Sequence, residues 1–309
     1  MTRRVLVNVA HSVHQRLLNR AQALGRPFNE VLQHYVVERF VARLARSTHR
    51  EDFALKGATL LRVWNAPLQR PTHDLDLLAL GESSKEQIAA AVRACLSLDD
   101  PDDGLRFEPA SLRLESLRHE GGYETVRLHA AASLGRARLM LHLDVGRGDA
   151  VYPAPEMLLF PTFLGGESPL VLAYRRETAI AEKVHAMVVL GRANTRLRDF
   201  LDVWGLAHGF AFDGTILAGA IGATFERRRT ELPDTLPECL TSAFLSNPER
   251  VLLWAVLMRR LGYVPAPELT AVGDGLSEFL LPVVEGLRTS GGYHGAWQPG
   301  GPWISKEPG

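Results

Sequence analysis

The sequence is poor in cysteine and has no long apolar run. Its 309 residues include only two cysteines, Cys95 and Cys239, which lie far apart and lack the spacing of metal ligands. This excludes a disulfide framework and indicates a reducing compartment. No apolar run approaches the roughly 18 to 20 residues that span a bilayer, and the basic N-terminus lacks the apolar core of a signal peptide. We therefore expect a cytoplasmic protein that does not associate with a membrane.

The sequence also lacks net charge, with 35 basic and 35 acidic side chains. Together with an ordinary apolar content, this excludes disordered and fibrous classes. The length allows one large domain or two ordinary ones. The charge is unevenly distributed, because residues 1 to 50 carry nine arginines against two glutamates, a net charge of +7. Such a segment can bind a polyanion, but taken alone it is more simply read as a solvated helical surface.

The spacing of apolar residues and turn formers predicts helices first and then a mixed α/β segment. Helices are expected over 12–24 and 28–46. Strands are expected over 53–56, 75–80, 105–114, 123–130 and 137–145, with helices over 59–64 and 84–96. The last three strands are separated by glycine turns and predict an antiparallel meander.

The second half of the chain is predicted to be helical. A Pro-rich connection over 152–169 leads to six helices, and the tail from 289 is rich in Gly and Pro and is expected to be irregular. The helices are expected over 176–190, 196–208, 213–226, 236–245, 248–260 and 267–287. The predicted organisation is a basic helical segment (1–50), an α/β core (51–155), a helical lobe (156–288) and a tail (289–309).

The stretch from 53 to 80 contains the pattern with the clearest chemistry. Asp74 and Asp76 alternate with Leu75 and Leu77, so in a strand both carboxylates point to one face and both leucines to the core. Two carboxylates so close repel each other unless a cation lies between them, which favours a divalent metal ion. The expected ion is Mg²⁺ or Mn²⁺. Asp144, set in the apolar strand 137–145, is a candidate third ligand.

A glycine turn precedes the aspartate pair. Gly57 and Ala58 are small enough for a phosphate to approach the backbone at the start of the helix that follows, and the Thr59 hydroxyl could add a hydrogen bond. Three carboxylates could hold two divalent ions about 3.5–4 Å apart, and Asp144 could take up the proton of an incoming hydroxyl. Such a site would transfer a nucleotidyl or phosphoryl group from a nucleoside triphosphate (NTP).

These residues resemble a known family. KGATLLRVW and RPTHDLDLL (56–64 and 70–78) are similar to the DNA-polymerase-β-like nucleotidyltransferase superfamily. LHLDVGRGDAVYP (141–153), the stretch 174–204 with its AEK and RLRDF motifs, and WQPGGPW (297–303) narrow the resemblance to the AbiEii/MenT-type nucleotidyltransferase toxins. The resemblance implies an α/β fold of the α+β type. It consists of a nucleotidyltransferase core with a small mixed sheet, followed by a bundle-like helical lobe.

The resemblance also implies roles for residues of the core. Lys56, Gly57 and Thr59 fall on the turn that grips the triphosphate, although this chain has Gly57-Ala58 where the family usually has two glycines. The S/T-x-D-x-D stretch corresponds to Thr72, Asp74 and Asp76. The two aspartates and Asp144 are implied metal ligands, and all three are implied to be catalytic.

In the helical half, Lys183 falls on the lysine that faces the nucleotide in such enzymes, and it is implied to be catalytic. Asp199 or Asp202 falls on the acidic part of the last motif, and Arg198 beside them could contact phosphate. The alternative is a set of structural ion pairs on solvated helix faces. The sequence leaves open which aspartate is functional.

Three other residues favour structural roles. His142 shares a strand face with Asp144, but a packed or hydrogen-bonded histidine is the simpler interpretation. Trp297 and Trp303 are expected to pack the tail onto the core rather than stack on a base.

The favoured function is a metal-dependent transfer of NMP from an NTP to RNA, in particular to the 3′ end of tRNA. The family implies a toxin of a type IV-like toxin–antitoxin or abortive-infection system, with a cognate antitoxin encoded nearby. Two alternatives remain at this stage. One is a nucleotidyltransferase that modifies protein hydroxyls, as AMP-transferring relatives do, and the other is a non-catalytic regulator that binds NTP or RNA.

Overall fold

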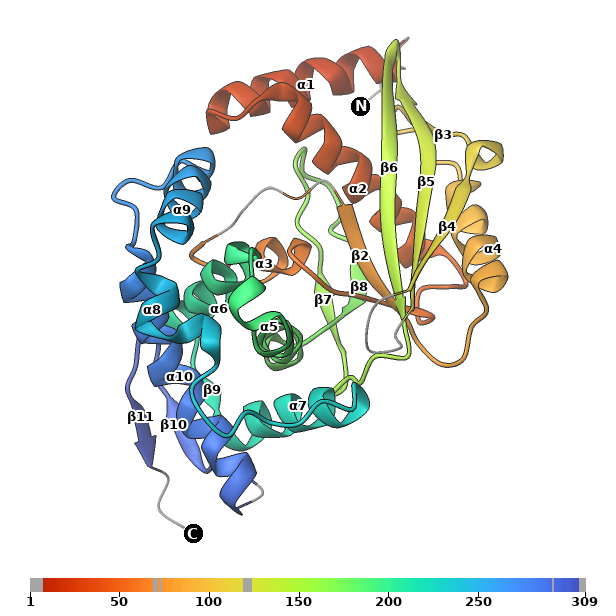
Figure 1. The fold of residues 1–309 in the computed structure, drawn as a ribbon. Helices are drawn as coiled ribbons and strands as arrows, with labels where there is room; N and C mark the ends of the chain where they lie inside the picture. The colour runs from red at the N-terminus through yellow and green to blue at the C-terminus, as the bar shows by residue number, and fades with distance from the viewer. Residues whose placement is uncertain (1–7, 69–71, 73, 119–123, 291, 306–309) are drawn as a thin grey trace. The chain divides into compact units, whose positions relative to one another are not determined.

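The structure is a computed structural model that describes residues 8–68, 72, 74–118, 124–290 and 292–305. The chain forms two compact units (Figure 1). Unit 1 comprises Met1–Val63, Pro71–Gly148 and Glu156–Ala173, and unit 2 comprises Trp64–Arg70, Asp149–Pro155 and Tyr174–Gly309. The four predicted segments, which end at residues 50, 155, 288 and 309, stay a prediction.

Unit 1 is built on a mixed sheet of eight strands, in the order β3-β5-β6-β2-β1-β8-β7, with β4 also paired to β5. β2 pairs with β6 and β1 with β8 in parallel, and the other pairs are antiparallel. The strands are β1 (Phe53–Leu55), β2 (Asp74–Ala79), β3 (Leu105–Phe107), β4 (Arg113–Arg118), β5 (Glu124–Leu134), β6 (Ala137–Arg147), β7 (Glu156–Leu159) and β8 (Leu170–Ala173).

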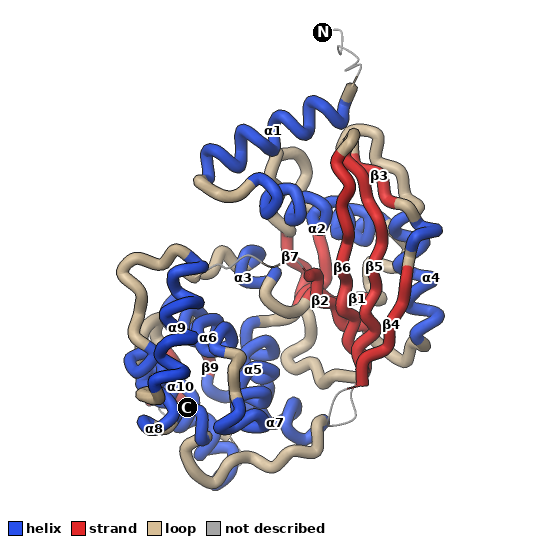
Figure 2. Tube along the Cα trace, turned by 45° about the horizontal axis from the view of Figure 1, so that its top comes forward, coloured by secondary structure: helices blue, strands red, loops and turns tan. Residues whose placement is uncertain are grey.

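Strand alternation separates a buried face of this sheet from a polar one. Leu75, Leu77, Leu143 and Val145 are fully buried on the first face. Helix α2 (Phe28–Arg46) packs on β6 and β8, α4 (Lys85–Leu96) packs beside α2, and α1 (Val9–Leu24) packs on α2 (Figure 2). The predicted helix 28–46 is confirmed to the residue, because Pro27 precedes it and its apolar positions recur at helical spacing.

Unit 2 is mainly helical. Helices α5, α6 and α7 pack together with α10, while α9 packs on α6 and α8. Their bounds are α5 (Arg176–Leu190), α6 (Leu197–Gly209), α7 (Gly214–Arg227), α8 (Ser242–Leu245), α9 (Pro248–Leu261) and α10 (Leu269–Ser290). A mixed sheet followed by a helical unit confirms the predicted α/β fold of the α+β type.

The structure corrects several predicted elements. The strand expected over 105–114 is broken by a 3₁₀ turn, Pro109–Ser111, because proline has no N–H to continue the ladder. The helix expected over 236–245 is a 3₁₀ turn, Glu238–Leu240, followed by the single turn of α8. The Pro-rich connection over 152–169 contains β7, whose backbone is satisfied by pairing with β8.

The tail is not irregular in its described part. β9 (Phe212–Asp213), β10 (Gly295–Trp297) and β11 (Trp303–Ser305) form a small antiparallel sheet in unit 2. Both indole N–H groups of this sheet donate to backbone carbonyls, from Trp297 to Ala207 at 2.7 Å and from Trp303 to Phe279 at 3.0 Å. The predicted packing role of these tryptophans is confirmed. No helix in the described ranges has the length and apolarity needed to cross a membrane.

Candidate active site

Strand β2 carries the aspartate pair as predicted, with Asp74 at its first residue and Asp76 two residues further on. Asp74 is exposed and Asp76 is half-buried, while the intervening Leu75 is fully buried. The backbone N–H of Lys56 donates to the carbonyl of Asp76 at 3.0 Å, which joins the start of the glycine turn to β2.

The parallel pairing of β2 with β6 brings the third aspartate to the pair. Asp76 lies directly opposite Asp144, and Asp74 lies opposite His142. Partners in adjacent strands lie about 5 Å apart and point to the same face. The backbone therefore places all three predicted carboxylates on one face of two neighbouring strands, although they come from segments about 70 residues apart in the chain.

Sequence reasoning missed Arg127, which holds Asp144. Arg127 lies opposite Asp144 on β5, and its guanidinium donates to both carboxylate oxygens, at 2.8 and 2.7 Å. A bidentate pair of this kind is strong and directional. Its hydrogen bonds to Asp144 raise the pKa of the Arg127 guanidinium above its ordinary value. The only signal in the sequence is the position of Arg127 on the polar side of an alternating strand.

The glycine turn adjoins the same carboxylates. Gly57 has a φ of 69°, and a Cβ added there would overlap the carboxylate of Asp76. Only glycine fits this position without strain. Thr59 begins α3 (Thr59–Val63), and its hydroxyl oxygen is buried with no hydrogen-bond partner in the described structure. A buried polar atom without a partner is unfavourable and indicates a site for a polar ligand.

Thr72 also lies near β2. Its hydroxyl donates to the backbone carbonyl of Asp74 at 3.1 Å, a local bond that supports the chain at the start of the strand. The structure thus brings together Lys56, Gly57, Thr59, Thr72, Asp74, Asp76 and Asp144 within unit 1.

The residues of this cluster suit a divalent cation in ligand type and backbone placement. Mg²⁺ and Mn²⁺ prefer carboxylate oxygens, and three carboxylates on one face supply them. Within the described ranges, however, no group of three His, Cys, Asp or Glu side chains is arranged to hold a metal ion. The bidentate contact of Arg127 with Asp144 offers a reason, because the third carboxylate is directed to a guanidinium.

His142 makes a close contact with a second histidine on the same face. The Nδ1 atoms of His129 and His142 lie 2.7 Å apart, so one of them donates to the other. Burial lowers the pKa of His142, and the neighbouring His129 lowers it further. The predicted hydrogen-bonded role of His142 is confirmed.

A second cluster lies in unit 2. Lys183 on α5 donates to Asp199 at 2.8 Å and to Asp202 at 2.7 Å, both on α6. The carboxylates are 5% and 1% exposed, so the lysine compensates two buried charges. Sequence spacing alone does not show that both aspartates share one lysine. The predicted catalytic role of Lys183 stays a prediction beside this structural role.

Two arginines flank the second cluster. Arg196, whose side chain is 59% exposed, forms an ion pair with Asp199 at 2.8 Å. Arg198 is exposed at the start of α6. Its predicted contact with a phosphate stays a prediction.

Comparison with known proteins identifies the family. The sequence model described as "Nucleotidyl transferase AbiEii toxin, Type IV TA system" matches residues 39–277. No curated protein matches the chain.

Among solved structures, the chain is similar to MenT4, a nucleotidyltransferase toxin from Mycobacterium tuberculosis H37Rv. The sequence identity is 17% and the TM-score 0.51, over 91% of this chain and 99% of that one. It is also similar to JHP933 from Helicobacter pylori, at 15% identity and a TM-score of 0.39, over 76% of this chain and 94% of that one. The first likeness confirms the fold. The chain belongs to the AbiEii family of nucleotidyltransferase toxins of type IV toxin–antitoxin systems.

Proposed function

We propose that the protein transfers the NMP unit of an NTP to a hydroxyl of RNA, in particular at the 3′ end of tRNA, in a reaction that needs Mg²⁺ or Mn²⁺. The observation that carries this proposal is the register of β2 and β6, which sets Asp144 directly opposite Asp76. The family supplies nucleotidyl transfer and an antitoxin partner. RNA as acceptor and a cytoplasmic site of action are parts of the proposal.

The chain offers a separate group for each requirement of the reaction. The backbone at Gly57 and the Thr59 hydroxyl are proposed to hold the triphosphate, because this turn has no side chain to obstruct it and a hydroxyl to donate. Asp74, Asp76 and Asp144 are proposed to hold the divalent cation, which when bound neutralises charge that develops on the phosphoryl oxygens.

Asp144 is proposed to act on the acceptor. A carboxylate of Asp144 released from Arg127 can accept the proton of the incoming hydroxyl. The new phosphodiester forms at that hydroxyl as the bond to pyrophosphate breaks. The proposed role of Lys183, with Arg198 and either Asp199 or Asp202, is to contact the nucleotide.

The test is incorporation of label into separate pools. The protein is incubated with each α-labelled NTP in turn, with Mg²⁺, and with either total RNA or total protein from which RNA has been removed. We expect label in RNA from at least one NTP, and none when EDTA replaces Mg²⁺. Label in the protein pool alone would show that the acceptor is a protein and not RNA. Label in neither pool, with no NTP consumed, would contradict the proposal.

A further inference from the structure

The arginines of the N-terminal helices divide into two groups. The structure describes seven of them between residues 8 and 50, and five form ion pairs with acids of unit 1. These pairs are Arg26–Glu30, Arg39–Glu38, Arg43–Asp103, Arg46–Asp100 and Arg50–Glu51, with distances from 2.6 to 3.0 Å. The basic segment is therefore much less cationic in the fold than in the sequence.

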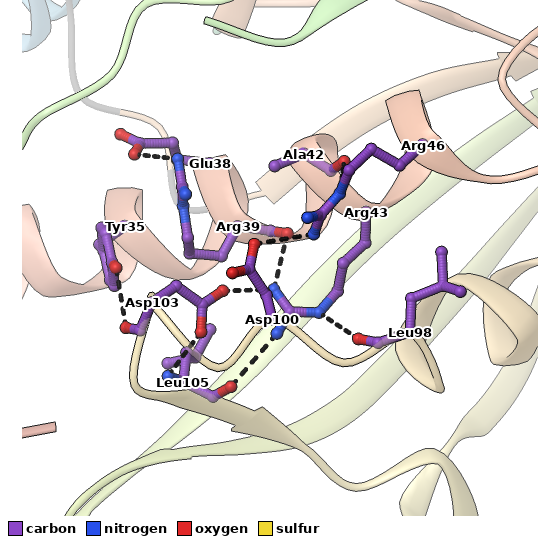
Figure 3. A network of polar contacts seen from close by, with 10 residues as sticks. All are labelled: Tyr35, Glu38, Arg39, Ala42, Arg43, Arg46, Leu98, Asp100, Asp103 and Leu105. Atoms are coloured by element: carbon purple, nitrogen blue, oxygen red, sulfur yellow. Dashed lines mark hydrogen bonds and ion pairs between the residues drawn. The ribbon is translucent and has the colours of Figure 1, made fainter. Parts of the chain in front are cut away.

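Figure 3 shows why the paired group is structural. Arg43 is buried in α2 and donates to the carboxylate of Asp103 and to the carbonyls of Leu98 and Leu105. Arg46 reaches Asp100 from the same helix. These contacts tie α2 to the segment between α4 and β3. A groove of about 860 Å³ beside them is lined by Arg16 of α1, by three of the paired arginines and by five acids, so it offers no excess of positive charge to a polyanion.

The second group consists of Arg16 and Arg20 on α1. They lie four residues apart and so occupy one exposed face of the helix. Neither forms an ion pair with a described residue, and Arg16 donates to the backbone carbonyl of Leu164 at 2.8 Å. With Asn19, they line a surface depression of about 340 Å³, whose full lining is Arg16, Asn19, Arg20, Ala23, Phe163 and Leu164. None of the lining residues is acidic.

A third arginine contacts a wall of this depression without lining it. The guanidinium of Arg62 on α3 stacks on the ring of Phe163, 3.8 Å from its centroid, and donates to the carbonyl of Pro161. Burial lowers the pKa of Arg62, Glu38 opposes this effect, and the charges of Arg26 and Arg20 lower it further. Arg20, which lines the depression, and Arg62, beside its Phe163 wall, therefore repel each other, and a bound anion would reduce this repulsion.

The position of Arg62 connects the depression to the candidate active site. Arg62 lies in α3, a helix of five residues that begins at Thr59, directly after the Gly57 turn. Through its contact with Phe163, Arg62 thus joins the helix that follows the Gly57 turn to the wall of the depression, within unit 1.

We propose that the depression lined by Arg16, Asn19 and Arg20 binds the sugar–phosphate backbone of the RNA acceptor. Arginine is suited to this ligand because its planar fork matches phosphate oxygens, and Asn19 can donate to phosphate or to a 2′-hydroxyl. The contact is independent of base sequence. This inference rests on the proposed RNA acceptor.

The test measures RNA binding without catalysis. Fluorescence anisotropy with labelled tRNA and with a single-stranded RNA, without NTP or metal, compares the full-length chain with Arg16→Ala/Arg20→Ala. The matched control is Arg46→Ala/Arg50→Ala, which removes two arginines of the same segment that are 51% and 59% exposed but paired with acids. Thermal melting checks each variant. Arg20→Ala alone removes no described contact within the chain, so it replaces the double variant if that protein does not fold.

We expect Arg16→Ala/Arg20→Ala to raise the Kd for RNA roughly tenfold or more and to reduce the slope of log K against log salt by about 1.4 on a single strand. The control changes the Kd by less than about twofold. Equal Kd values and slopes for the two double variants overturn the inference, as does a loss of NTP binding with RNA binding unchanged.

The results distinguish a failure of this inference from a failure of the proposed function. If the arginine variants weaken RNA binding but no NMP reaches RNA, this inference stands and the proposed reaction fails. If transfer to RNA occurs with the same KM for RNA in Arg16→Ala/Arg20→Ala, the proposed function stands and this inference fails.

Discussion

Arg127 donates to both carboxylate oxygens of Asp144 across the pair β5–β6, at 2.8 and 2.7 Å. The guanidinium thus binds the carboxylate that is predicted to complete a metal site with Asp74 and Asp76. Removing it should favour a cation there, because a positive charge that repels the metal is lost and Asp144 is left to find another partner.

We expect Arg127→Ala to bind Mn²⁺ more tightly, by roughly tenfold, which is about 1.4 kcal/mol. Isothermal titration with Mn²⁺ in the absence of NTP measures this directly. Arg147→Ala is the control, because Arg147 forms a comparable ion pair with Glu124 on the same two strands, at 2.6 Å. Unchanged or weaker Mn²⁺ binding in Arg127→Ala would show that Asp144 is not a metal ligand.

Replacing Gly57 should be more damaging than replacing Gly81, because only at Gly57, of the two, would an added Cβ meet a neighbouring side chain. Gly57→Ala places a Cβ against the Asp76 carboxylate at a φ of 69°, whereas Gly81 has a φ of 72° and open space around it. Gly81→Ala should lower the free energy of unfolding by about 1–2 kcal/mol through backbone strain alone. Gly57→Ala should lower it further and should reduce NTP turnover by about tenfold or more. Chemical denaturation and turnover assays on both variants decide this, and equal effects would contradict the close approach.

Lys183 can be tested for a role beyond charge compensation. Lys183→Met leaves two buried carboxylates without their lysine and should lower the free energy of unfolding by about 3–5 kcal/mol. Adding Asp202→Asn should restore about 1–2 kcal/mol, because one buried charge is removed. If Lys183 contacts the nucleotide, activity stays lost in the double variant, and Asp202→Asn alone measures any loss that Asp202 itself causes. Activity that returns together with stability would assign Lys183 a structural role only.

The protonation of His185 should make the stability of unit 2 depend on pH. Arg228 can only donate, so its contact with Nδ1 at 3.2 Å makes that atom an acceptor, and Nε2–H donates to Thr230 at 2.9 Å. Burial, and then the charge of Arg228, lowers the pKa of His185 to about 4.

Because the fold lowers this pKa, neutral His185 contributes fully to the free energy of unfolding above the ordinary histidine pKa near 6.5. This contribution is lost as the pH falls towards 4. The loss attributable to His185 should reach about 3 kcal/mol. Urea unfolding between pH 7 and pH 4, compared with His185→Gln, isolates this contribution. Parallel pH profiles for the two proteins would show that His185 is not buried in its neutral form.

The sequence predicts features that depend on local spacing. The α2 helix follows from its apolar periodicity, and the placement of Asp74 and Asp76 on one face follows from strand alternation. Both rest on side-chain period alone, so both could be derived without knowing any tertiary contact.

Features that depend on pairing between distant segments could not be derived in this way. The contact of Arg127 with Asp144 needs the register of β5 with β6, and a slip of one residue would turn Arg127 to the opposite face. β7 and β10 lie in Pro- and Gly-rich stretches whose composition indicates loops, yet each is a strand because a neighbouring strand satisfies its backbone. The ion pairs Arg43–Asp103 and Arg46–Asp100 likewise depend on acids that the fold brings from a distant segment.

The central claim is that the carboxylates of β2 carry the transfer of NMP to RNA. The most direct measurement supplies purified tRNA, Mg²⁺ and α-labelled NTPs to the wild type, to Asp74→Asn and to Asp102→Asn, a control in an exposed loop. The account predicts labelled tRNA from the wild type and the control, and a loss of at least about a hundredfold in Asp74→Asn with unchanged thermal stability. Asp74→Asn that labels tRNA at the wild-type rate would contradict it.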